Sequence, residues 1–510
     1  MPGPGTAEMA RTVGPLSCLS CLCCLCCLCC LCCLCCLLVV TGPVLAAPAA
    51  TDPRPNVILV MADDQGWGDT GYNGHPHLKT PHLDRMAADG LVFRRWYAGA
   101  PVCSPTRGSC LTGRHPYRYG IVTANRGHLP RRERTLAELL RYRGYRTGHF
   151  GKWHVGTLTT EIEDSNRGGP RGKQHFSPPW KNGFQVCFST EAKVPTWDPL
   201  LKPKTARGRR WWNPAKDPAD TVPYGTRYWN HLGKSITENT RGDDSRVIMD
   251  RAVPFIESAA RDKSPFLAVI WFHAPHLPVV AGPKHTALYA DHPDYHRHYY
   301  GCITALDEQV GRLRATLEKL GIAKNTMLWY SADNGPEGNN KAPGRTRGLR
   351  GRKRSLYEGG IRVPGIVTWP AVVQAGQTTD SPGVTSDYLP TILDVLGVLP
   401  PRKFTPDGIS LLPVLKGQRD RQRPQPILFE SAGQTAAIDN RFKLVRRSAG
   451  SGKKNKTAGK DTTELFDLLA DPRETTNVAA DHPRVLEELS AKIKAWQASC
   501  RASAARNAAR

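Results

Sequence analysis

The chain has 510 residues, of which 40% are hydrophobic and 23% charged, a composition that excludes a wholly disordered protein. Its 70 Lys and Arg residues outnumber its 45 Asp and Glu residues, so the formal net charge is +25 at pH 7. This excess does not determine a fold. It favours contact with polyanions such as sulfated sugars, nucleic acid or acidic lipid, and a merely soluble basic surface is the alternative.

The N-terminal segment has the features of an export signal. Residues 12–46 contain no charged side chain, and twelve of the 17 cysteines lie in a Cys/Leu repeat between Cys18 and Cys36. Small residues close the apolar run and favour cleavage after Ala46. We therefore expect a signal peptide over residues 1–46 and a secreted or periplasmic protein. A retained membrane anchor is the alternative, because the apolar run is long for a signal.

Five later segments have the length and composition of buried strands: residues 56–64, 145–154, 266–276, 326–335 and 363–370. Amphipathic helical patterns lie between them, at residues 135–144, 245–262 and 296–321. Strands that alternate with helices predict an α/β fold, with a large mixed, mostly parallel sheet flanked by helices. In such sheets ligands bind beyond the carboxyl ends of the strands, and the chemically able residues follow those ends here.

Two further regions depart from this alternation. Residues 160–235 are rich in Pro, Gly and Lys and hold five of the 12 tryptophans, namely Trp180, Trp197, Trp211, Trp212 and Trp229. We predict long substrate-facing loops there, with indole rings available to sugar rings; packing of these tryptophans on each other is the alternative. After about residue 400 the pattern changes to short strands and a terminal helix. We therefore expect a catalytic domain over 52–398 and a small C-terminal sheet-plus-helix (α+β) domain over 399–510.

Two of the predicted strands end in oxygen-bearing side chains. Asp63 and Asp64 follow the first, and Asp333 and Asn334 follow the fourth. Carboxylate and amide oxygens are the ligands that hard cations prefer, which predicts a calcium or magnesium site. Helix capping is the alternative for any single aspartate.

Basic side chains also lie near the ends of predicted strands or in nearby loops. Arg107, Lys152, His154, His276 and Lys353 lie near strand ends or in glycine-flanked loops. A metal ion with a ring of cations fits an anionic centre such as sulfate or phosphate. Separate surface charges are the alternative reading of each residue.

The residues around Cys103 make the prediction specific. The sequence CSPTR (103–107) fits the pattern Cys-x-Pro-x-Arg, the signature of sulfatases, and GYRTGHFGKWH (144–154) resembles the second signature of that family. The segments MADDQGWGDTGYNG, HAPHLP, ADNG and KRSLYEGGIRVP are also similar to sulfatase segments and occur in the family's order. The resemblance runs from about residue 54 to 395 and implies an alkaline-phosphatase-like fold.

The resemblance implies roles for individual residues. The family oxidises its signature cysteine to formylglycine, so Cys103 would be modified by a formylglycine-generating enzyme, leaving four later cysteines that could pair. The positions that match the family's Ca²⁺ ligands are Asp63, Asp64, Asp333 and Asn334, with the modified Cys103 side chain completing the shell. The positions that match its catalytic groups are Arg107, Lys152, His154, His276 (rather than His273) and Lys353.

These roles imply a mechanism. Hydrated formylglycine is a gem-diol, and one hydroxyl would attack sulfur as an oxyanion favoured by Ca²⁺ and Arg107. His276 or Lys353 would protonate the departing alcohol, and His154 would remove the proton of the second hydroxyl to expel sulfate.

We therefore expect hydrolysis of sulfate esters, with a sulfated carbohydrate such as a glycosaminoglycan as substrate. A phosphate or phosphonate ester hydrolase of the same superfamily is one alternative. An inactive secreted polyanion-binding protein is the other, suggested by the basic segments 202–210 and 345–354. No motif indicates nucleic acid, and stable membrane contact would require the N-terminal segment to be retained.

Overall fold

The structure is a computed structural model that describes residues 53–208, 210–400, 404–449 and 461–508. The predicted signal peptide, residues 1–46, lies outside the described residues. Residues Asp52–Arg510 form one compact unit. No helix in the described ranges combines the length and the apolar composition needed to cross a bilayer.

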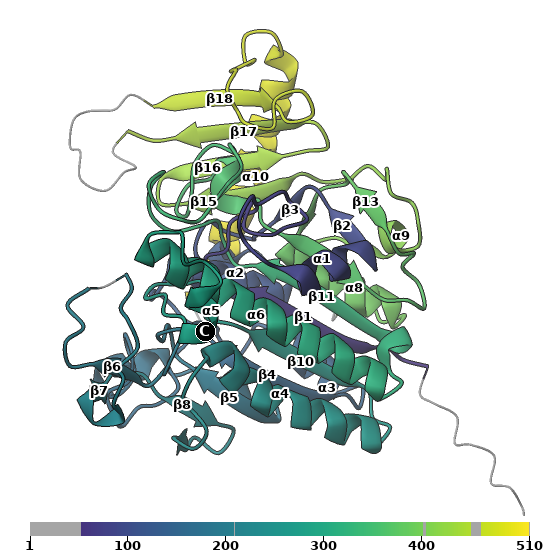
Figure 1. The fold of residues 1–510 in the computed structure, drawn as a ribbon. Helices are drawn as coiled ribbons and strands as arrows, with labels where there is room; N and C mark the ends of the chain where they lie inside the picture. The colour runs from purple at the N-terminus through teal and green to yellow at the C-terminus, as the bar shows by residue number, and fades with distance from the viewer. Residues whose placement is uncertain (1–52, 209, 401–403, 450–460, 509–510) are drawn as a thin grey trace, which may run out of the picture. The chain divides into compact units, whose positions relative to one another are not determined.

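Among the described residues, ten strands form the main sheet (Figure 1). In spatial order they are β13 (Gln377–Thr379), β2 (Leu91–Phe93), β12 (Gly365–Thr368), β11 (Thr326–Ala332), β1 (Asn56–Ala62), β10 (Phe266–Trp271), β4 (Arg146–Lys152), β5 (Val186–Thr190), β8 (Tyr228–Asn230) and β9 (Ser235–Ile236). The central run from β11 to β5 is parallel, and β12, β8 and β9 add antiparallel pairs on either side. The predicted mixed, mostly parallel sheet is confirmed.

The strands β1, β4, β10 and β11 lie where the sequence patterns predict them. The fifth predicted strand, 363–370, contains β12, which runs antiparallel to β11. Residues 160–235 are not loops throughout, because they supply β5, β8 and β9 to the sheet and a separate two-stranded ribbon of β6 (Leu201–Pro203) and β7 (Thr221–Pro223).

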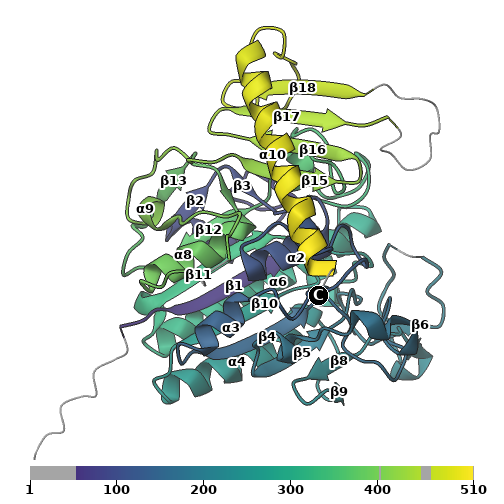
Figure 2. The same ribbon diagram turned by 180° about the vertical axis from the view of Figure 1, so that it is seen from behind.

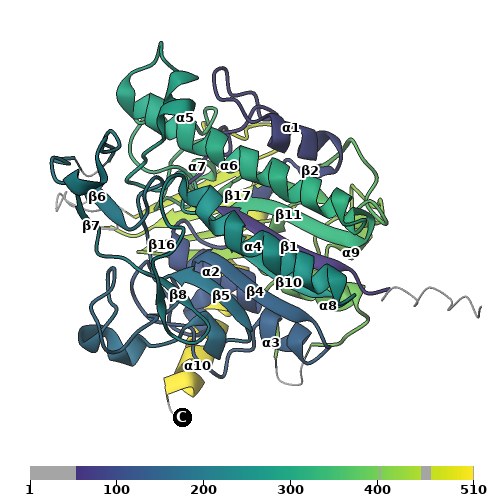
Figure 3. The same ribbon diagram turned by 60° about the horizontal axis from the view of Figure 1, so that its bottom comes forward.

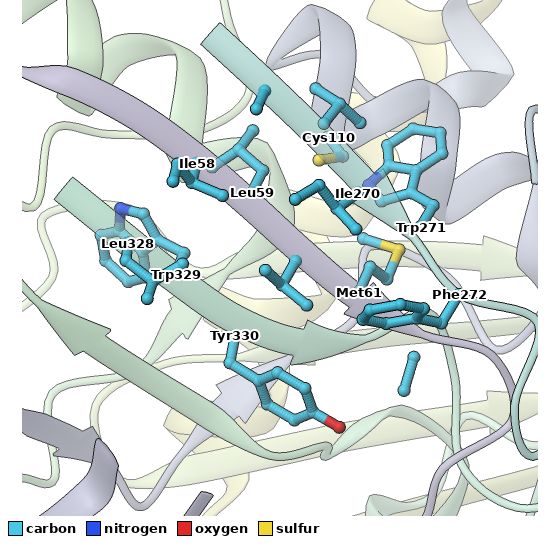
Figure 4. Close-up of a cluster of buried hydrophobic side chains, with 14 of the residues drawn as sticks. Ile58, Leu59, Met61, Cys110, Ile270, Trp271, Phe272, Leu328, Trp329 and Tyr330 are labelled. Atoms are coloured by element: carbon cyan, nitrogen blue, oxygen red, sulfur yellow. The ribbon is translucent and has the colours of Figure 1, made fainter. Parts of the chain in front are cut away.

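The core of the molecule lies on both faces of the central strands. In β1, every residue from Val57 to Ala62 is buried, as expected for an interior strand of a parallel sheet. Figure 4 shows side chains of β1, β10 and β11 packed together, among them Met61, Trp271 and Trp329. Cys110 of α2 (Cys103–Thr112) lies in the same cluster, so this helix is packed directly on the sheet.

Helices cover the two faces of the sheet. One layer contains α1 (Pro81–Ala88), α4 (Asp244–Arg261), α5 (Pro283–Ala287) and α6 (Asp294–Lys319), and is nearest the viewer in Figure 1. The other contains α2, α3 (Leu136–Arg141) and α8 (Tyr388–Val395), which Figure 2 shows from behind. Figure 3 shows the sheet between the two layers. The helices predicted over 135–144, 245–262 and 296–321 correspond to α3, α4 and α6.

The C-terminal part is an antiparallel sheet with one long helix. The strands are β15 (Ile427–Ser431), β16 (Gln434–Ile438), β17 (Phe442–Arg447) and β18 (Thr462–Asp467), and the helix is α10 (Pro483–Ala508). One face of this sheet packs on α10 through Leu444, Leu465 and Ile493. The other face packs on residues of the main fold such as Tyr97 and Ile361. The smaller C-terminal α+β part of the predicted fold is therefore present.

Two short helices, α7 (Glu358–Ile361) and α9 (Leu412–Leu415), and the strand pair β3 (Trp96–Tyr97) with β14 (Gly383–Val384) lie outside the main sheet. The five cysteines of the described residues are buried and unpaired, namely Cys103, Cys110, Cys187, Cys302 and Cys500. The four cysteines that could have paired therefore form no disulfide with one another. They fill separate parts of the interior as small apolar side chains.

Candidate active site

The candidate active site lies where four neighbouring strands of the main sheet end. Because β11, β1, β10 and β4 are adjacent and parallel, their carboxyl ends share one edge. Ala62 pairs with Ala332, so the residues that follow them, Asp63 and Asp333, leave the sheet side by side. The backbone amide of Asp333 donates to the carbonyl of Ala62 at 3.1 Å. Lys152 is the last residue of β4 and reaches the same edge.

Two carboxylates at this edge are paired with buried lysines. Lys152 Nζ lies 2.5 Å from Asp63 Oδ2, and Lys353 Nζ lies 2.5 and 2.7 Å from the two oxygens of Asp64. Burial alone would raise the pKa of the Asp64 carboxyl, but the charge of Lys353 outweighs it and holds this pKa below its usual range. Burial would lower the pKa of Lys353, and Asp64 raises it well above its usual value. Asp64 and Lys353 are therefore both charged at neutral pH.

Arg107 binds the third carboxylate of the site. Its Nε and Nη2 donate to Asp333 Oδ2 at 3.1 and 2.7 Å, and its Nη1 donates to the backbone carbonyl of Lys152 at 3.0 Å. The guanidinium also lies 5.1 Å from the ring centroid of Trp271. Burial, and then repulsion from the neighbouring carboxylate, raise the pKa of Asp333 to about 6 despite Arg107. Arg107 follows Cys103 by four residues on α2, so both side chains are on one helix face.

Cys103 begins α2, a helix whose ten residues are all buried. Val102, in extended backbone, precedes it as the N-cap residue. Burial raises the pKa of the Cys103 thiol to about 12, and the nearby lysines do not offset this effect. Thiol reactivity requires the thiolate, so the unmodified side chain is chemically inert at neutral pH.

Two histidines face the site as neutral bases. His276 Nδ1 lies 2.7 Å from the carbonyl oxygen of Leu277, which can only accept, so Nδ1 carries the proton and Nε2 has the free lone pair. That Nε2 lies 3.7 Å from Asp64 Oδ2. His154 Nε2 lies 2.8 Å from Asn125 Oδ1. Burial lowers the pKa of both imidazoles well below the usual value, with nearby cations acting in the same direction.

His273, which the family resemblance did not match to a catalytic position, lies apart from this group. Its Nδ1 is 2.8 Å from Asp244 Oδ2 and its Nε2 is 2.7 Å from Thr190 Oγ1. Both ring nitrogens are thus used inside the protein, which makes His273 a structural residue.

The donor atoms at the strand ends fit a hard cation. Asp63 Oδ1 and Asn334 Oδ1 are buried and have no hydrogen-bond partner among the described residues. One ligand atom each from Asp63, Asp64, Cys103 and His276 lies within 4.8 Å of the other three. An unpartnered buried oxygen costs about 1–3 kcal/mol, and a divalent ion would remove that cost by coordination.

Among His, Cys, Asp and Glu residues, this four-residue group differs from the expected ligand set at two positions. His276 belongs to the group, whereas Asp333 does not. Asp333 Oδ2 is bound by Arg107, and its Oδ1 accepts the backbone amide of Asp64 at 3.1 Å. Asp333 therefore borders the group, and its hydrogen bonds fix the backbone of the ligand-bearing loop.

A pocket of about 710 Å³ opens onto Cys103. Its wall includes four Lys and Arg side chains and two histidines, and no Asp or Glu: Lys152, Lys193, Lys353, Arg354, His154 and His276. The carboxylates of the site lie beneath this cationic surface. A pocket of this size and charge accepts a small anionic group together with part of the molecule that carries it.

Sequence reasoning missed several residues of the pocket wall. Asn125, Asn166 and Lys193 come from loops that carry no recognisable motif, and Ser431 and Gln434 come from the hairpin between β15 and β16. Only the packing of the C-terminal sheet on the main fold brings that hairpin to the pocket.

None of the five clustered tryptophans lines this pocket. Trp229 is 4% exposed and Trp212 is 9% exposed. The ring of Trp211 stacks on that of His298, at 5.3 Å between centroids and 25° between planes. The segment 160–235 reaches the pocket instead through three residues, namely Asn166, Ala192 and Lys193.

Comparison with known families agrees with the fold and the site. The profile of the sulfatase family matches residues 55–398, and that of the N-sulphoglucosamine sulphohydrolase C-terminal region matches residues 351–499. The chain belongs to the sulfatase family, and its activity is the hydrolysis of sulfate esters.

Characterised relatives span most of the chain. N-acetylgalactosamine-6-sulfatase of Mus musculus is 33% identical over 428 residues, which cover 79% of this chain and 73% of that protein. Arylsulfatase A of Homo sapiens is 30% identical over 497 residues, covering 87% and 88% respectively. Steryl-sulfatase of Rattus norvegicus is 32% identical, covering 72% and 71%.

Solved structures share the whole fold. The structure of Ps i-CgsB in complex with k-i-k-neocarrahexaose superposes with a TM-score of 0.71 at 26% identity, covering 87% of this chain and 92% of that one. The phosphonate monoester hydrolase of Agrobacterium radiobacter superposes with a TM-score of 0.60 at 19% identity, covering 88% and 96%. Because the second protein is named for another reaction, the fold alone does not select sulfate.

Proposed function

We propose that this protein removes sulfate from a sulfated carbohydrate, with formylglycine formed from Cys103 and a Ca²⁺ ion held at the strand ends. The observation that carries the proposal is the position of Cys103 itself. It lies at the floor of a pocket walled by cations, directly against Asp63 and Asp64. Burial raises the pKa of this thiol to about 12, so the unmodified side chain is a poor nucleophile at neutral pH.

The residues that would hold Ca²⁺ are Asp63, Asp64 and Asn334, with the side chain at position 103, and Asp333 would border the ion because its oxygens accept from Arg107 and from the Asp64 amide. The oxygen-only protein ligands and the two unpartnered buried oxygens support this assignment. His276 Nε2 lies beside the same atoms and is a further candidate ligand. When bound, the ion would act as a Lewis acid that lowers the pKa of a coordinated hydroxyl.

The charge balance of the site supports a divalent ion as well. Three buried carboxylates face three permanent cations, Arg107, Lys152 and Lys353, so these groups sum to zero charge. A bound divalent ion would give the site a charge of about +2, which suits an anionic ester together with an anionic nucleophile.

Each of the remaining residues has a role that its contacts support. Formylglycine, hydrated to a gem-diol, supplies one hydroxyl as the nucleophile and a second from which a proton can be removed. Arg107 is held by Asp333 and orients position 103 from one helical turn away. The free Nδ1 of His154 accepts a proton. Lys152 and Lys353 stabilise negative charge, and Lys353 gives a proton to the departing alcohol, because the neutral His276 carries its only proton on the Nδ1 that is bound to Leu277.

The substrate class rests on the wall of the pocket and on relatives. The wall carries four Lys and Arg side chains and no Asp or Glu, which favours an anionic substrate. One relative is named for N-acetylgalactosamine 6-sulfate, and one structural neighbour was solved with neocarrahexaose. A relative named for steryl sulfate shows that the family extends to apolar alcohols, so the sugar assignment needs its own test.

The central test combines mass spectrometry with activity. We expect that protein produced together with a formylglycine-generating enzyme has an aldehyde at residue 103 in the tryptic peptide, and that it releases sulfate from defined sulfated saccharides. The Cys103→Ala variant should fold equally well and fall to background rates. An active Cys103→Ala variant, or an unmodified thiol in active protein, would refute the nucleophile.

Two comparisons test the alternatives. Rates on an aryl sulfate and on the matching aryl phosphate should favour the sulfate; a reversed preference would make the protein a phosphate or phosphonate hydrolase. Heparin binding without turnover of any sulfate ester would indicate an inactive polyanion-binding protein.

We also propose export through the N-terminal segment. N-terminal sequencing of the mature protein after secretion tests the expected cleavage after Ala46.

A further inference from the structure

A second, larger groove lies next to the Cys103 pocket. Its volume is about 1,220 Å³, and its lining shares no residue with that of the pocket. Arg352 lines the groove, whereas the next two residues, Lys353 and Arg354, line the pocket. Consecutive residues of one backbone segment therefore line the two cavities, which makes them neighbours in the structure.

Four separate parts of the chain form the groove. Residues 340–352 come from the connection between β11 and α7, and residues 473–475 come from the turn after β18. His296 of α6 and Glu464 of β18 complete the lining. The groove thus exists only because the C-terminal sheet packs beside the 340–352 loop.

The groove exposes cations that no carboxylate neutralises. Lys341, Arg345, Arg347 and Arg473 are exposed, and within the described residues none of their side-chain nitrogens lies within 4.0 Å of an Asp or Glu oxygen. Both acidic residues of the lining have other partners. Glu464 accepts from Arg350 at 3.0 Å, and Glu474 is buried against Lys443 at 2.9 Å.

The backbone that carries these cations is anchored. The carboxylate of Asp69 accepts the backbone amide of Arg345 and the hydroxyl of Tyr299, each at 2.8 Å. Arg352 Nη2 donates to the carbonyls of Glu337 and Gly344, at 3.0 and 2.8 Å. Because the loop is held from both sides, less conformational entropy is lost when a ligand binds its side chains.

We propose that this groove is a second binding site for a sulfated polysaccharide chain, one that holds the polymer beside the Cys103 pocket while a single sulfate group is removed. The inference rests on the substrate class proposed above. A polysaccharide with sulfate groups along its length is the ligand that complements exposed arginines at one cavity and a sulfate-hydrolysing site at the next. Contact at the groove raises the effective concentration of the polymer at the pocket without changing the chemistry there.

The test uses a triple variant with a charge-matched control. The groove variant is Arg345→Gln, Arg347→Gln and Arg473→Gln. The control is Arg141→Gln, Arg261→Gln and Lys319→Gln, three exposed residues in the last turns of α3, α4 and α6. Those helices lead into β4, β10 and β11, so the control residues lie at the edge of the sheet opposite the site. Both variants lose three positive charges.

Two quantities are measured for each full-length protein: the affinity for a fluorescein-labelled heparin octasaccharide, by anisotropy at two salt concentrations, and the turnover of 4-nitrophenyl sulfate. The groove variant should bind the octasaccharide about tenfold more weakly, with a shallower dependence on salt, because three ion contacts are lost. Turnover of the small ester should be unchanged in both variants, and the control should bind the octasaccharide like the parent.

Several results would overturn the proposal. Equal weakening in the two variants would mean that binding follows net charge alone. Unchanged binding in the groove variant would remove the groove from recognition. Displacement of the octasaccharide by single-stranded DNA of equal charge, at equal concentration, would mean that the groove does not select a polysaccharide.

The result of the groove test can be distinguished from the result of the test of the proposed function. If binding depends on the three arginines but no sulfated saccharide loses sulfate, the substrate assignment fails and the groove remains a polysaccharide site. If saccharides are desulfated with the same KM and kcat by the groove variant and by the parent, the substrate assignment stands and the groove proposal fails.

Discussion

Asn125 illustrates how single residues control the chemistry of the pocket. Its Oδ1 lies 2.8 Å from His154 Nε2 and 2.9 Å from Asn166 Nδ2, an arrangement in which the oxygen accepts from both. The proton of the neutral imidazole is therefore on Nε2, and the buried Nδ1 keeps its lone pair. His154 has a positive φ of 59°, and its backbone amide is held by the carbonyl of Glu191 at 2.9 Å. Asn125 is thus a positioning residue for the proposed base.

The Asn125→Ala variant should lower kcat by about tenfold, because a general base contributes about 10²–10⁴-fold and only its orientation is lost. Burial holds the pKa of His154 well below its usual value, and the base acts only when neutral. A more open site would let this pKa rise, so the acidic limb of the kcat profile should move to higher pH. A pH series of kcat on an aryl sulfate measures both effects.

Asn166→Ala is the matched control for that variant. It removes the second partner of Asn125 and leaves the hydrogen bond to His154 in place. Equal losses in the two variants, or an unmoved acidic limb in Asn125→Ala, would contradict the positioning role.

At the scale of elements, a buried ion cluster joins the C-terminal sheet to the main fold. Lys443 of β17 lies 2.9 Å from both Glu358 of α7 and Glu474, and all three side chains are fully buried. Burial would lower the pKa of Lys443, but the two carboxylates outweigh it and raise this pKa. Burial, together with repulsion from Glu358, raises the pKa of Glu474 to about 7. The lysine is therefore needed to keep two acidic groups in the interior.

The Lys443→Met variant should lose about 3–5 kcal/mol of the free energy of unfolding, because it removes the cation shared by two buried carboxylates and leaves Glu358 with only the more distant Arg362, at 3.5 Å. The pKa of Glu474, already raised to about 7 by burial, would then rise further, and the pKa of Glu358, which burial alone would raise and Lys443 holds below its usual value, would also rise. An acid with a raised pKa destabilises the folded state as pH increases, so the loss should be smaller at about pH 5 than at about pH 8. Urea unfolding at the two pH values measures this difference.

Arg441→Met provides the comparison for Lys443→Met. Arg441 also pairs with a carboxylate, that of Asp467 at 2.6 Å, but its side chain is 57% exposed. Its loss should cost far less stability than the loss of Lys443 at either pH, because an exposed ion pair is screened by solvent. Similar costs for the two variants would show that the buried cluster contributes no more than a surface ion pair.

For the molecule as a whole, the carboxylate site at the strand ends links metal binding to stability. The residues that meet there are distributed along the chain from Asp63 to Lys353. A ligand that binds only the folded state stabilises it by mass action, by about 2.7 kcal/mol at a hundred times Kd. Ca²⁺ should therefore raise the melting temperature of the entire unit, and EDTA should reverse the increase.

This stabilisation should disappear in Asp63→Asn, which alters the one Asp63 oxygen that is free for a ligand. Asp69→Asn is the control, because Asp69 is equally buried but both its oxygens are bound within the protein. Differential scanning fluorimetry with Ca²⁺ and with EDTA distinguishes the two variants. A Ca²⁺-induced shift of the same size in Asp63→Asn and in the parent would place the ion elsewhere.

The sequence indicated the elements because their signals are local. The branched apolar run of β1 and the amphipathic period of α6 are each contained in a few consecutive residues, and burial follows from them. The polar residues after each strand could likewise be placed at one edge, because parallel strands share their carboxyl ends. The direction of β12 could not be predicted, because antiparallel pairing depends on the path of the chain outside the strand.

By itself, then, the sequence determined the fold class, the family resemblance and the residues that follow the strand ends. The tertiary structure alone decided which atoms meet. The register that pairs Ala62 with Ala332, the hydrogen bond from His154 to Asn125 and the hairpin that brings Gln434 to the pocket all join distant parts of the chain. Such contacts depend on the packing of the whole molecule, and short-range periodicity carries no information about them.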